Sequence, residues 1–266
     1  MSEQHLRIRP AAVAGMFYSN DPDQLQSEIN HYLSSATPHS SSIPKAIIAP
    51  HAGYTYSGPV AASAYKLLQP LENKIKHVVL LGPSHRVAFQ GIATPGADYF
   101  STPLGKIKID IENCVLAEQF AFVHKLPAAH EQEHSLEVQL PFLQTVLNEF
   151  TLTPLVVGDC NPDDVAELLN RLWGHEDTLI VISSDLSHYH SYDSAQQLDA
   201  NTSHAIVHLQ PENISYEDAC GRTPLNGLLT LAKQKHLQIE TLDLRNSGDT
   251  AGSKDRVVGY GSYVVH

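Results

Sequence analysis

The chain has 266 residues, of which 42% are apolar and 17% are charged, and its formal net charge is −12. This composition is typical of a globular protein with a sizeable core and argues against an intrinsically disordered chain. The negative charge argues against nucleic acid and anionic membranes as main partners, because both attract basic surfaces. Histidine is unusually frequent, with 16 copies spread along the sequence.

The cysteine content and the lack of an apolar targeting segment lead us to expect a cytoplasmic location. The three cysteines, Cys114, Cys160 and Cys220, are odd in number and lack C-x-x-C spacing, which argues against a disulfide framework and a zinc knuckle. The segment Met1–Pro10 lacks the apolar core of a signal peptide. Because apolar runs stay far below the ~20 residues of a membrane span, we expect a soluble, cytoplasmic protein.

Apolar patterning predicts strands that alternate with helices along the chain. Short β-branched runs bounded by Gly, Pro or Ser predict buried strands, and amphipathic stretches that begin near Pro or Asn-Pro predict helices. In chain order, the expected elements are strand 46–49, helix 59–68, strand 78–81, a hairpin in 89–110, helix 136–150 with a kink or later start at Pro141, strand 155–157, helix 162–172 capped by Asn161, strand 179–182, helices 194–209 and 224–234, and a closing strand 256–265.

This alternation predicts an α/β fold with a mainly parallel or mixed central sheet and helices on both faces. The sequence shows neither an internal repeat nor a low-complexity tail, and no stretch has the composition of a linker. We therefore expect one domain that spans residues 1–266.

The residues that follow three of the predicted strands point to a metal site. His51 follows the strand 46–49, His85 follows 78–81, and Asp185 and His188 follow 179–182. In open α/β sheets, ligands bind beyond the carboxyl ends of the strands, so these side chains should meet in one cleft. Neutral imidazole is a common ligand for zinc, iron and copper, and two histidines with one carboxylate form the facial triad of non-haem iron sites.

Each of these residues also has a structural interpretation. A lone histidine is more often a hydrogen-bonded residue than a ligand, and Asp185 could cap a helix. His130 and His134 have the spacing of the H-E-x-x-H motif of zinc proteases, but the polar residues between them disfavour that interpretation. We expect instead that the segment 133–137 opens a helix and points His134 into the cleft. The segment 220–224 could place a thiol and a guanidinium near an anionic group, or form a turn before the next helix.

Taken together, six short motifs resemble the signatures of the Memo family, in the family's order and from about Arg9 to the C-terminus. They are A-I-I-A-P-H-A-G-Y-T-Y-S-G at 46–58, L-G-P-S-H at 81–85, S-T-P-L-G at 101–105, E-H-S-L-E at 133–137, S-S-D-L-S-H at 183–188 and C-G-R-T-P at 220–224.

The resemblance implies a fold similar to the class III extradiol dioxygenases and a metal, with iron(II) expected and copper or zinc as alternatives. The family's two ligand histidines correspond to His51 and His85. In animal members the third ligand is a cysteine near the C-terminus, and the matching stretch 246–250 has none. Asp249 is the expected replacement, since a carboxylate completes a facial triad; it could also simply cap its turn.

Two main functions are compatible with these residues. The first is a metal-dependent oxidoreductase acting on a small molecule, with His134, Asp185 and His188 as catalytic acid–base groups. The second is an adaptor that recognises a phosphopeptide or protein partner in the same cleft, as animal members of the family are described to do. A zinc hydrolase is a third, weaker interpretation. The resemblance also implies a functional link to AMMECR-type and radical-SAM proteins.

Overall fold

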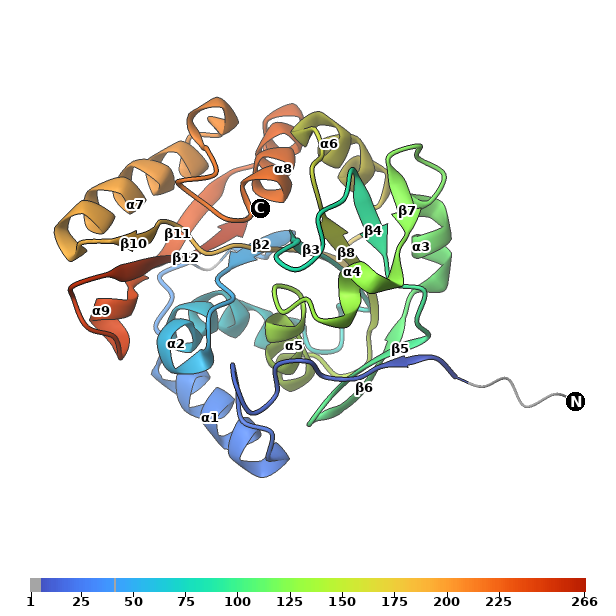
Figure 1. Ribbon diagram of the computed structural model, residues 1–266, viewed down its shortest axis with the longest axis horizontal. Helices are drawn as coiled ribbons and strands as arrows, with labels where there is room; N and C mark the ends of the chain where they lie inside the picture. The colour runs from blue at the N-terminus through green and yellow to red at the C-terminus, as the bar shows by residue number, and fades with distance from the viewer. Residues whose placement is uncertain (1–5, 41) are drawn as a thin grey trace, which may run out of the picture.

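In the computed structural model, which describes residues 6–40 and 42–266, the four predicted apolar strands lie side by side at the centre of one sheet (Figure 1). All four are parallel, in the spatial order β8 (Thr151–Val157), β3 (His77–Pro83), β9 (Thr178–Ser183) and β2 (Ala46–Ala49). Their side chains are almost all buried, which explains why they are apolar without polar alternation.

Shorter or antiparallel strands extend the sheet on both sides, and among the described residues it has twelve strands. Beyond β2 lies the antiparallel β12 (Val257–Val265), which also pairs with β11 (Ile239–Asn246) and β10 (His188–His190). On the other side, β8 pairs with β6 (Gly105–Ile109) and β4 (Ile92–Thr94), β6 is followed by β5 (Tyr99–Thr102) and β1 (Ile8–Arg9), and β4 pairs with β7 (Val123–Lys125). The predicted mixed α/β sheet is confirmed.

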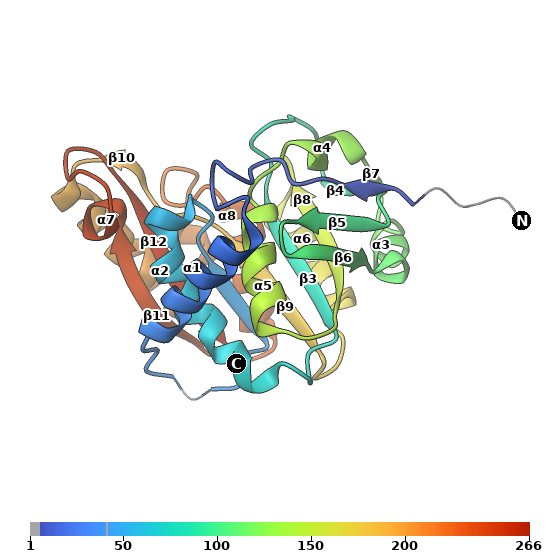
Figure 2. The ribbon, with the colours of Figure 1, turned by 90° about the horizontal axis from the view of Figure 1, so that it is seen from below.

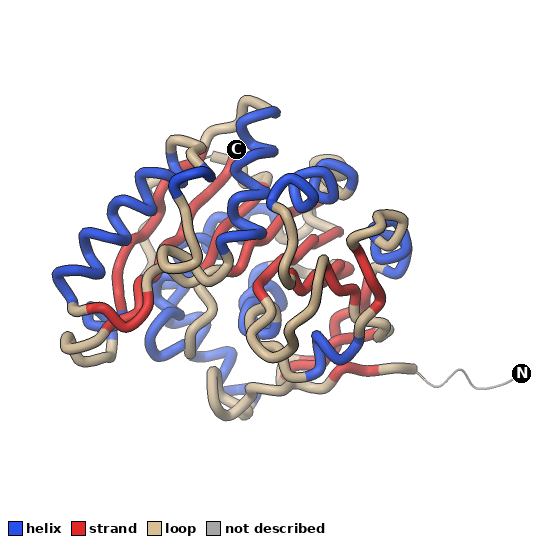
Figure 3. The backbone as a smooth tube through the Cα atoms, turned by 45° about the horizontal axis from the view of Figure 1, so that its top comes forward, coloured by secondary structure: helices blue, strands red, loops and turns tan. Residues whose placement is uncertain are grey.

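Helices cover both faces of this sheet (Figures 2 and 3). Ile47 and Leu80 lie in a core with α1 (Pro22–Ser35), α2 (Tyr54–Tyr65) and α5 (Leu140–Val146). The alternate residues Ile48 and Leu81 point to the opposite face, into a core with α6 (Pro162–Arg171), α7 (Tyr192–Val207) and α8 (Arg222–Gln234). The remaining helices are short: η1 (Lys66–Leu71), α3 (Ile111–Ala117), α4 (Pro127–Glu131), η2 (Glu137–Gln139), η3 (Pro211–Asn213) and α9 (Ser247–Thr250).

Local signals predicted some elements better than others. The side chain of Asn161 caps α6 as expected, the segment 89–110 contains the β5–β6 hairpin, and β12 is the closing strand. Two helix boundaries were wrong. The helix expected at 59–68 begins earlier, at Tyr54, and passes into η1 after Tyr65. The helix expected at 136–150 is divided into η2 and the short α5. The later start expected at Pro141 is confirmed, since α5 begins at Leu140, but the helix ends at Val146 and does not reach residue 150.

The parallel centre of the sheet brings three chemically important loops to one edge. Because β3, β9 and β2 are adjacent and parallel, the residues after their carboxyl ends are neighbours in space. These residues include His85, Asp185 and His51. In the part of the chain that the structure describes, no helix has the length and apolar character needed to cross a membrane.

Candidate metal centre

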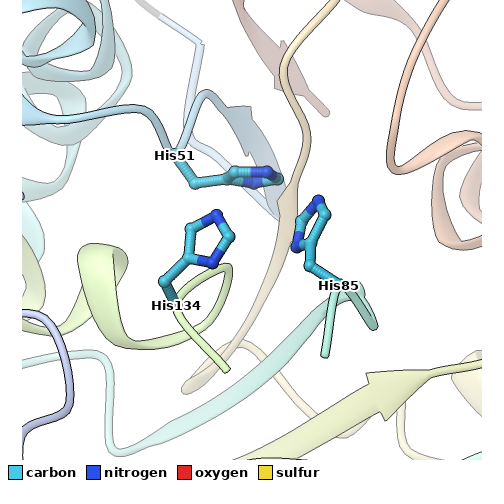
Figure 4. Close-up of side chains that lie close together, drawn as sticks. All are labelled: His51, His85 and His134. Carbon is cyan, nitrogen blue, oxygen red and sulfur yellow. The ribbon is translucent and has the colours of Figure 1, made fainter. Parts of the chain in front are cut away.

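Three histidine side chains converge at this edge of the sheet, with their rings facing one another (Figure 4). One nitrogen from each of His51, His85 and His134 can be chosen so that all three atoms lie within 4.8 Å of one another. The ring centroids are 5.3 Å apart for His51 and His85, 5.6 Å for His51 and His134, and 4.5 Å for His85 and His134. Three nitrogens at this separation can surround a single transition-metal ion.

Two strands and one loop deliver these side chains. His51 and His85 follow β2 and β3, whereas His134 lies in the irregular segment between α4 and η2. This segment rests on β3 at Gly82, where a Cβ atom would come within 2.8 Å of the Ser135 hydroxyl oxygen. The Ser135 hydroxyl donates to the carbonyl of Pro83 at 2.8 Å. Glycine at position 82 therefore allows the loop to approach closely enough to bring His134 to the other two rings.

The hydrogen bonds of Ser183 fix the proton on His51. The Ser183 hydroxyl donates its only proton to the carbonyl of Ser135 at 2.6 Å and accepts from the Gln139 amide at 2.7 Å. His51 Nδ1 lies 2.9 Å from the same oxygen, so it must donate to it. The proton of neutral His51 is therefore on Nδ1, and Nε2 carries the lone pair, 3.3 Å from the Cys220 sulfur.

A buried carboxylate supports the second histidine. Glu133 accepts from the backbone N–H of His85 at 2.5 Å and lies 2.9 Å from His85 Nδ1. It also accepts from the backbone N–H of Ser135 at 2.9 Å. Burial raises the pKa of Glu133, but the hydrogen bonds from the His85 ring and backbone outweigh this effect, and the net result is a pKa of about 2. Glu133 is therefore ionised and can only accept.

Two of the three histidines, His51 and His134, are uncharged at neutral pH, as metal ligands must be. Burial, followed by repulsion from His85, lowers the pKa of His51 to about 3. Burial, followed by repulsion from His51, lowers the pKa of His134 to about 4. Both rings therefore keep a free lone pair at pH 7, and the donor set fits a transition-metal ion.

The two other catalytic candidates line the same cleft. This cleft, which we call the histidine cleft, has a volume of about 600 Å³ and is lined by His51, His85, His134, Asp185 and His188, with Tyr56, Tyr189 and Arg256 among its other lining residues. Asp185 is buried, its carboxylate accepts from the backbone N–H of His51 at 2.7 Å, and burial raises its pKa. It does not cap a helix, because the chain around it is irregular. Five of the six predicted site residues thus meet in one place.

The sixth predicted residue, Asp249, does not belong to this group. Its side chain is the reciprocal partner in the capping box of α9, where it accepts from the backbone N–H of Asn246 at 3.0 Å and from the hydroxyl of Tyr192. Asp249 is exposed and lies outside the residues that line the histidine cleft. The structure thus favours the capping interpretation, and His134 takes the third place beside His51 and His85.

Cys220 lies next to the three histidines, a position that its sequence motif did not predict. Its sulfur lies 3.3 Å from His51 Nε2, and burial raises the pKa of the thiol to about 12. Gly221 makes this position possible, since a Cβ atom there would lie 2.7 Å from the Ser184 side chain. Cys220 and His85 also line a second cleft of about 770 Å³, the side cleft, whose walls include Phe89 and Tyr216. The C-G-R-T-P motif was the available sequence signal.

The H-E-x-x-H interpretation finds no support in the geometry. Helix α4 ends at Glu131, so His130 and His134 do not share a helix face. His130 is buried beside Phe100, and its Nε2 lies 2.9 Å from the carbonyl of Ala93. The segment 133–137 was expected to open a helix and point His134 into the cleft. The helix η2 begins only at Glu137, the last residue of this segment, but His134 does line the histidine cleft.

Comparison with known proteins places this arrangement in a family. The family model described as "Memo-like protein" matches residues 9–264. The chain belongs to the Memo family. The match covers all the loops that form the histidine cleft, and the resemblance inferred from the six motifs is therefore confirmed.

Curated relatives agree with this assignment over nearly their whole length. A MEMO1 family protein from Aquifex aeolicus is 36% identical over 96% of this chain and 98% of its own. Another, from Sulfolobus acidocaldarius, is 35% identical over 95% of this chain and 97% of its own. Among solved structures, an uncharacterized protein from Escherichia coli K12 matches 82% of this chain and 99% of its own, with a TM-score of 0.49 and 13% identity.

Proposed function

We propose that this Memo-family protein is a metal-dependent enzyme that acts on a small molecule, with the ion held by His51, His85 and His134. One observation carries the proposal: ligand atoms of three histidines lie within 4.8 Å of one another on the wall of a cleft of about 600 Å³. A centre with three protein ligands and an open cleft beside it has the arrangement of catalytic metal sites. Structural sites usually have four protein ligands and are closed to substrates.

The donor set narrows the choice of metal to ions that accept imidazole. Zinc, copper, iron and nickel all do so, and the family resemblance favours iron(II) among them. A bound ion would supply Lewis acidity or redox capacity to the cleft. Asp185 provides a carboxylate next to the backbone of His51, which favours binding of a cation at this position.

The chain's own groups would bind the substrate and move protons. His188 and Asp185 line the histidine cleft beside the three proposed ligands, and both can exchange protons with a bound molecule. The side cleft shares His85 with the histidine cleft and is also lined by Cys220, so a molecule bound there would lie next to the proposed centre. We propose His188 and Asp185 as the acid–base pair, with His134 as a ligand in place of the acid–base role expected from the sequence.

A binding or adaptor function is the second candidate, and the rim of the histidine cleft favours it. Tyr189 is 70% exposed and Tyr56 is 42% exposed, which is unusual for aromatic side chains beside a small-molecule site. Arg256 lines the same cleft and has no ion-pair partner among the described residues. An aromatic rim with an unpaired guanidinium suits a peptide that carries a phosphate or carboxylate group.

The two functions differ in their dependence on metal. Untagged protein should be purified anaerobically, loaded with iron(II), and compared with the variant His51→Ala/His85→Ala by oxygen uptake over a panel of small molecules. We expect uptake only with the metal-loaded wild type. If no compound is turned over, and a phosphotyrosine peptide binds the wild type and the double variant equally well without metal, the adaptor function replaces the enzyme. Cytoplasmic location and the link to AMMECR-type and radical-SAM proteins stay predictions.

A further inference from the structure

The Glu133 carboxylate lies next to the rings of two of the three proposed metal ligands, His85 and His134. It is 1% exposed and lies between the loop after β3 and the segment that carries His134. One of its oxygens is 2.9 Å from His85 Nδ1 and 3.4 Å from His134 Nδ1. Its other oxygen accepts from the backbone N–H of His85 at 2.5 Å. The Glu133 side chain is therefore close to the Nδ1 atom of both His85 and His134.

This contact decides which nitrogen of His85 carries the proton. A carboxylate without a proton can only accept hydrogen bonds, so the 2.9 Å contact requires a proton on His85 Nδ1. In the neutral ring, which is the form that binds a metal, Nδ1 carries the only N–H and Nε2 keeps its lone pair. This is the same tautomer that the Ser183 hydroxyl requires of His51.

The same carboxylate acts on His134 through proximity. His134 Nδ1 is buried and has no hydrogen-bond partner among the described residues. The negative oxygen of Glu133 at 3.4 Å makes Nδ1 the favourable position for the ring proton. The Nε2 atom of His134 is then free to act as a ligand, like those of His51 and His85.

We propose that Glu133 is the positioning residue of the centre, which holds His85 and His134 in the Nδ1–H tautomer so that both present Nε2 to the metal. The role in metal binding rests on the proposed function, whereas the tautomer assignment does not. Ligand histidines commonly donate their second N–H to a carboxylate, and loss of such a partner costs about 10- to 100-fold in metal affinity. Here one carboxylate oxygen lies beside the Nδ1 atoms of two proposed ligands, at 2.9 Å from His85 and 3.4 Å from His134.

A glutamine at position 133 separates this role from simple support of the loop. Glu133→Gln keeps the size of the side chain and one accepting oxygen, but it replaces the other oxygen with an N–H₂ donor. If this amide faces His85 Nδ1, the ring is driven to the opposite tautomer and its Nε2 becomes protonated. Glu131→Gln is the matched control. Glu131 is exposed, and its substitution removes the same negative charge two residues away from Glu133.

The test is nitrogen-15 NMR of the histidine rings in metal-free protein near neutral pH, followed by metal titration. We expect His85 and His134 to be protonated at Nδ1 in the wild type and in Glu131→Gln. In Glu133→Gln we expect His85 to gain the Nε2–H form and metal affinity to fall about 10- to 100-fold.

Two results would overturn the inference. One is Nε2–H in His85 of the wild type, which the wild-type spectrum reveals even if the variant does not fold. The other is a Glu133→Gln protein with unchanged tautomers and unchanged metal affinity. In contrast, the expected tautomers in a wild type that binds no metal would support the assignment and count only against the proposed function.

Discussion

At the scale of single residues, the centre depends on a few hydrogen bonds that cannot be read from composition. Ser183 illustrates this, because its hydroxyl has one proton and three neighbours: the carbonyl of Ser135, the amide of Gln139 and the ring of His51. The hydroxyl donates its proton to the Ser135 carbonyl and accepts a hydrogen bond from the Gln139 amide. Because the hydroxyl has no second proton, the contact with His51 requires His51 Nδ1–H to be the donor. Ser183, which does not line the histidine cleft, thus determines which nitrogen of His51 is available as the proposed ligand atom.

Removal of this hydroxyl should weaken the centre. In Ser183→Ala, His51 loses the acceptor for its Nδ1 proton, and the Gln139 amide loses a partner as well. We expect metal affinity to fall about 10-fold and the free energy of unfolding to fall by about 1–3 kcal/mol. Isothermal titration with the metal and urea unfolding measure the two effects.

Ser184→Ala is the matched control for this prediction. The Ser184 hydroxyl accepts from the backbone N–H of Gly221 at 2.9 Å and donates to the carbonyl of Asp185 at 2.8 Å, without contacting His51. We expect it to lower stability with little change in metal affinity. Equal losses of metal affinity in both variants would show that Ser183 supports the loop and does not select a tautomer.

At the scale of elements, the sheet was predictable because its strands are chemically simple. Short, buried, β-branched runs that alternate with helices are typical of central parallel strands, and their ends are marked by Gly, Pro or Ser. The convergence of His51, His85 and Asp185 followed from this, since it needs only adjacent parallel strands. Their place at one edge was the part of the site that the sequence could predict.

Helix boundaries were less predictable because tertiary contacts outweigh local signals. Pro59 was expected near the start of a helix but lies inside α2. The helix begins earlier, where the backbone N–H of Tyr54 donates to the carbonyl of Phe17 at 2.7 Å and its hydroxyl donates to that of Val138 at 2.7 Å. Pro141, in contrast, lies in the first turn of α5, where its missing N–H is not needed. The position of each proline is visible in the sequence, but the tertiary contacts of Tyr54 that set the start of α2 are not.

His134 was expected in the cleft, but its place as the third nitrogen beside His51 and His85 was not predicted, and neither was the contact between Cys220 and His51. His134 and Cys220 come from irregular loops, and no periodic pattern shows where such a loop lies. Asp249 was chosen from its place in the sequence, but Asn246 and Asp249 form a reciprocal cap, which is a local use of the same residue types. The sequence motifs marked these segments as functionally important, but only the folded structure shows that His134 and Cys220 lie next to His51.

At the scale of the whole molecule, buried neutral histidines make stability depend on pH. Burial is the largest cause of the lowered pKa of His51, to about 3, and of His130 and His134, each to about 4. In the unfolded chain these rings have a pKa of about 6.5, so below that pH the unfolded state binds more protons than the folded state. The stability present above pH 6.5 is therefore lost progressively as the pH falls towards about 4.

We expect metal-free protein to lose roughly 1–2 kcal/mol of unfolding free energy per buried histidine between about pH 7 and about pH 5. Urea unfolding at the two values measures this loss. The variant His51→Asn/His134→Asn should show a smaller loss, whereas His124→Gln, which changes an exposed ring, should behave like the wild type. A wild type with equal stability at both pH values would mean that these rings are not held neutral by burial.

We propose that His51, His85 and His134 hold one metal ion in this Memo-family fold, and the metal content of purified variants distinguishes this ligand set from one that includes Asp249. Untagged wild type, His134→Ala and Asp249→Ala should be purified anaerobically, reconstituted with iron(II), desalted and analysed for metal. We expect about one ion per chain in the wild type and in Asp249→Ala, and almost none in His134→Ala. Loss of the metal in Asp249→Ala with retention in His134→Ala would show that His134 is not a ligand, and a wild type that binds no metal after reconstitution would show that the three histidines do not form a metal site.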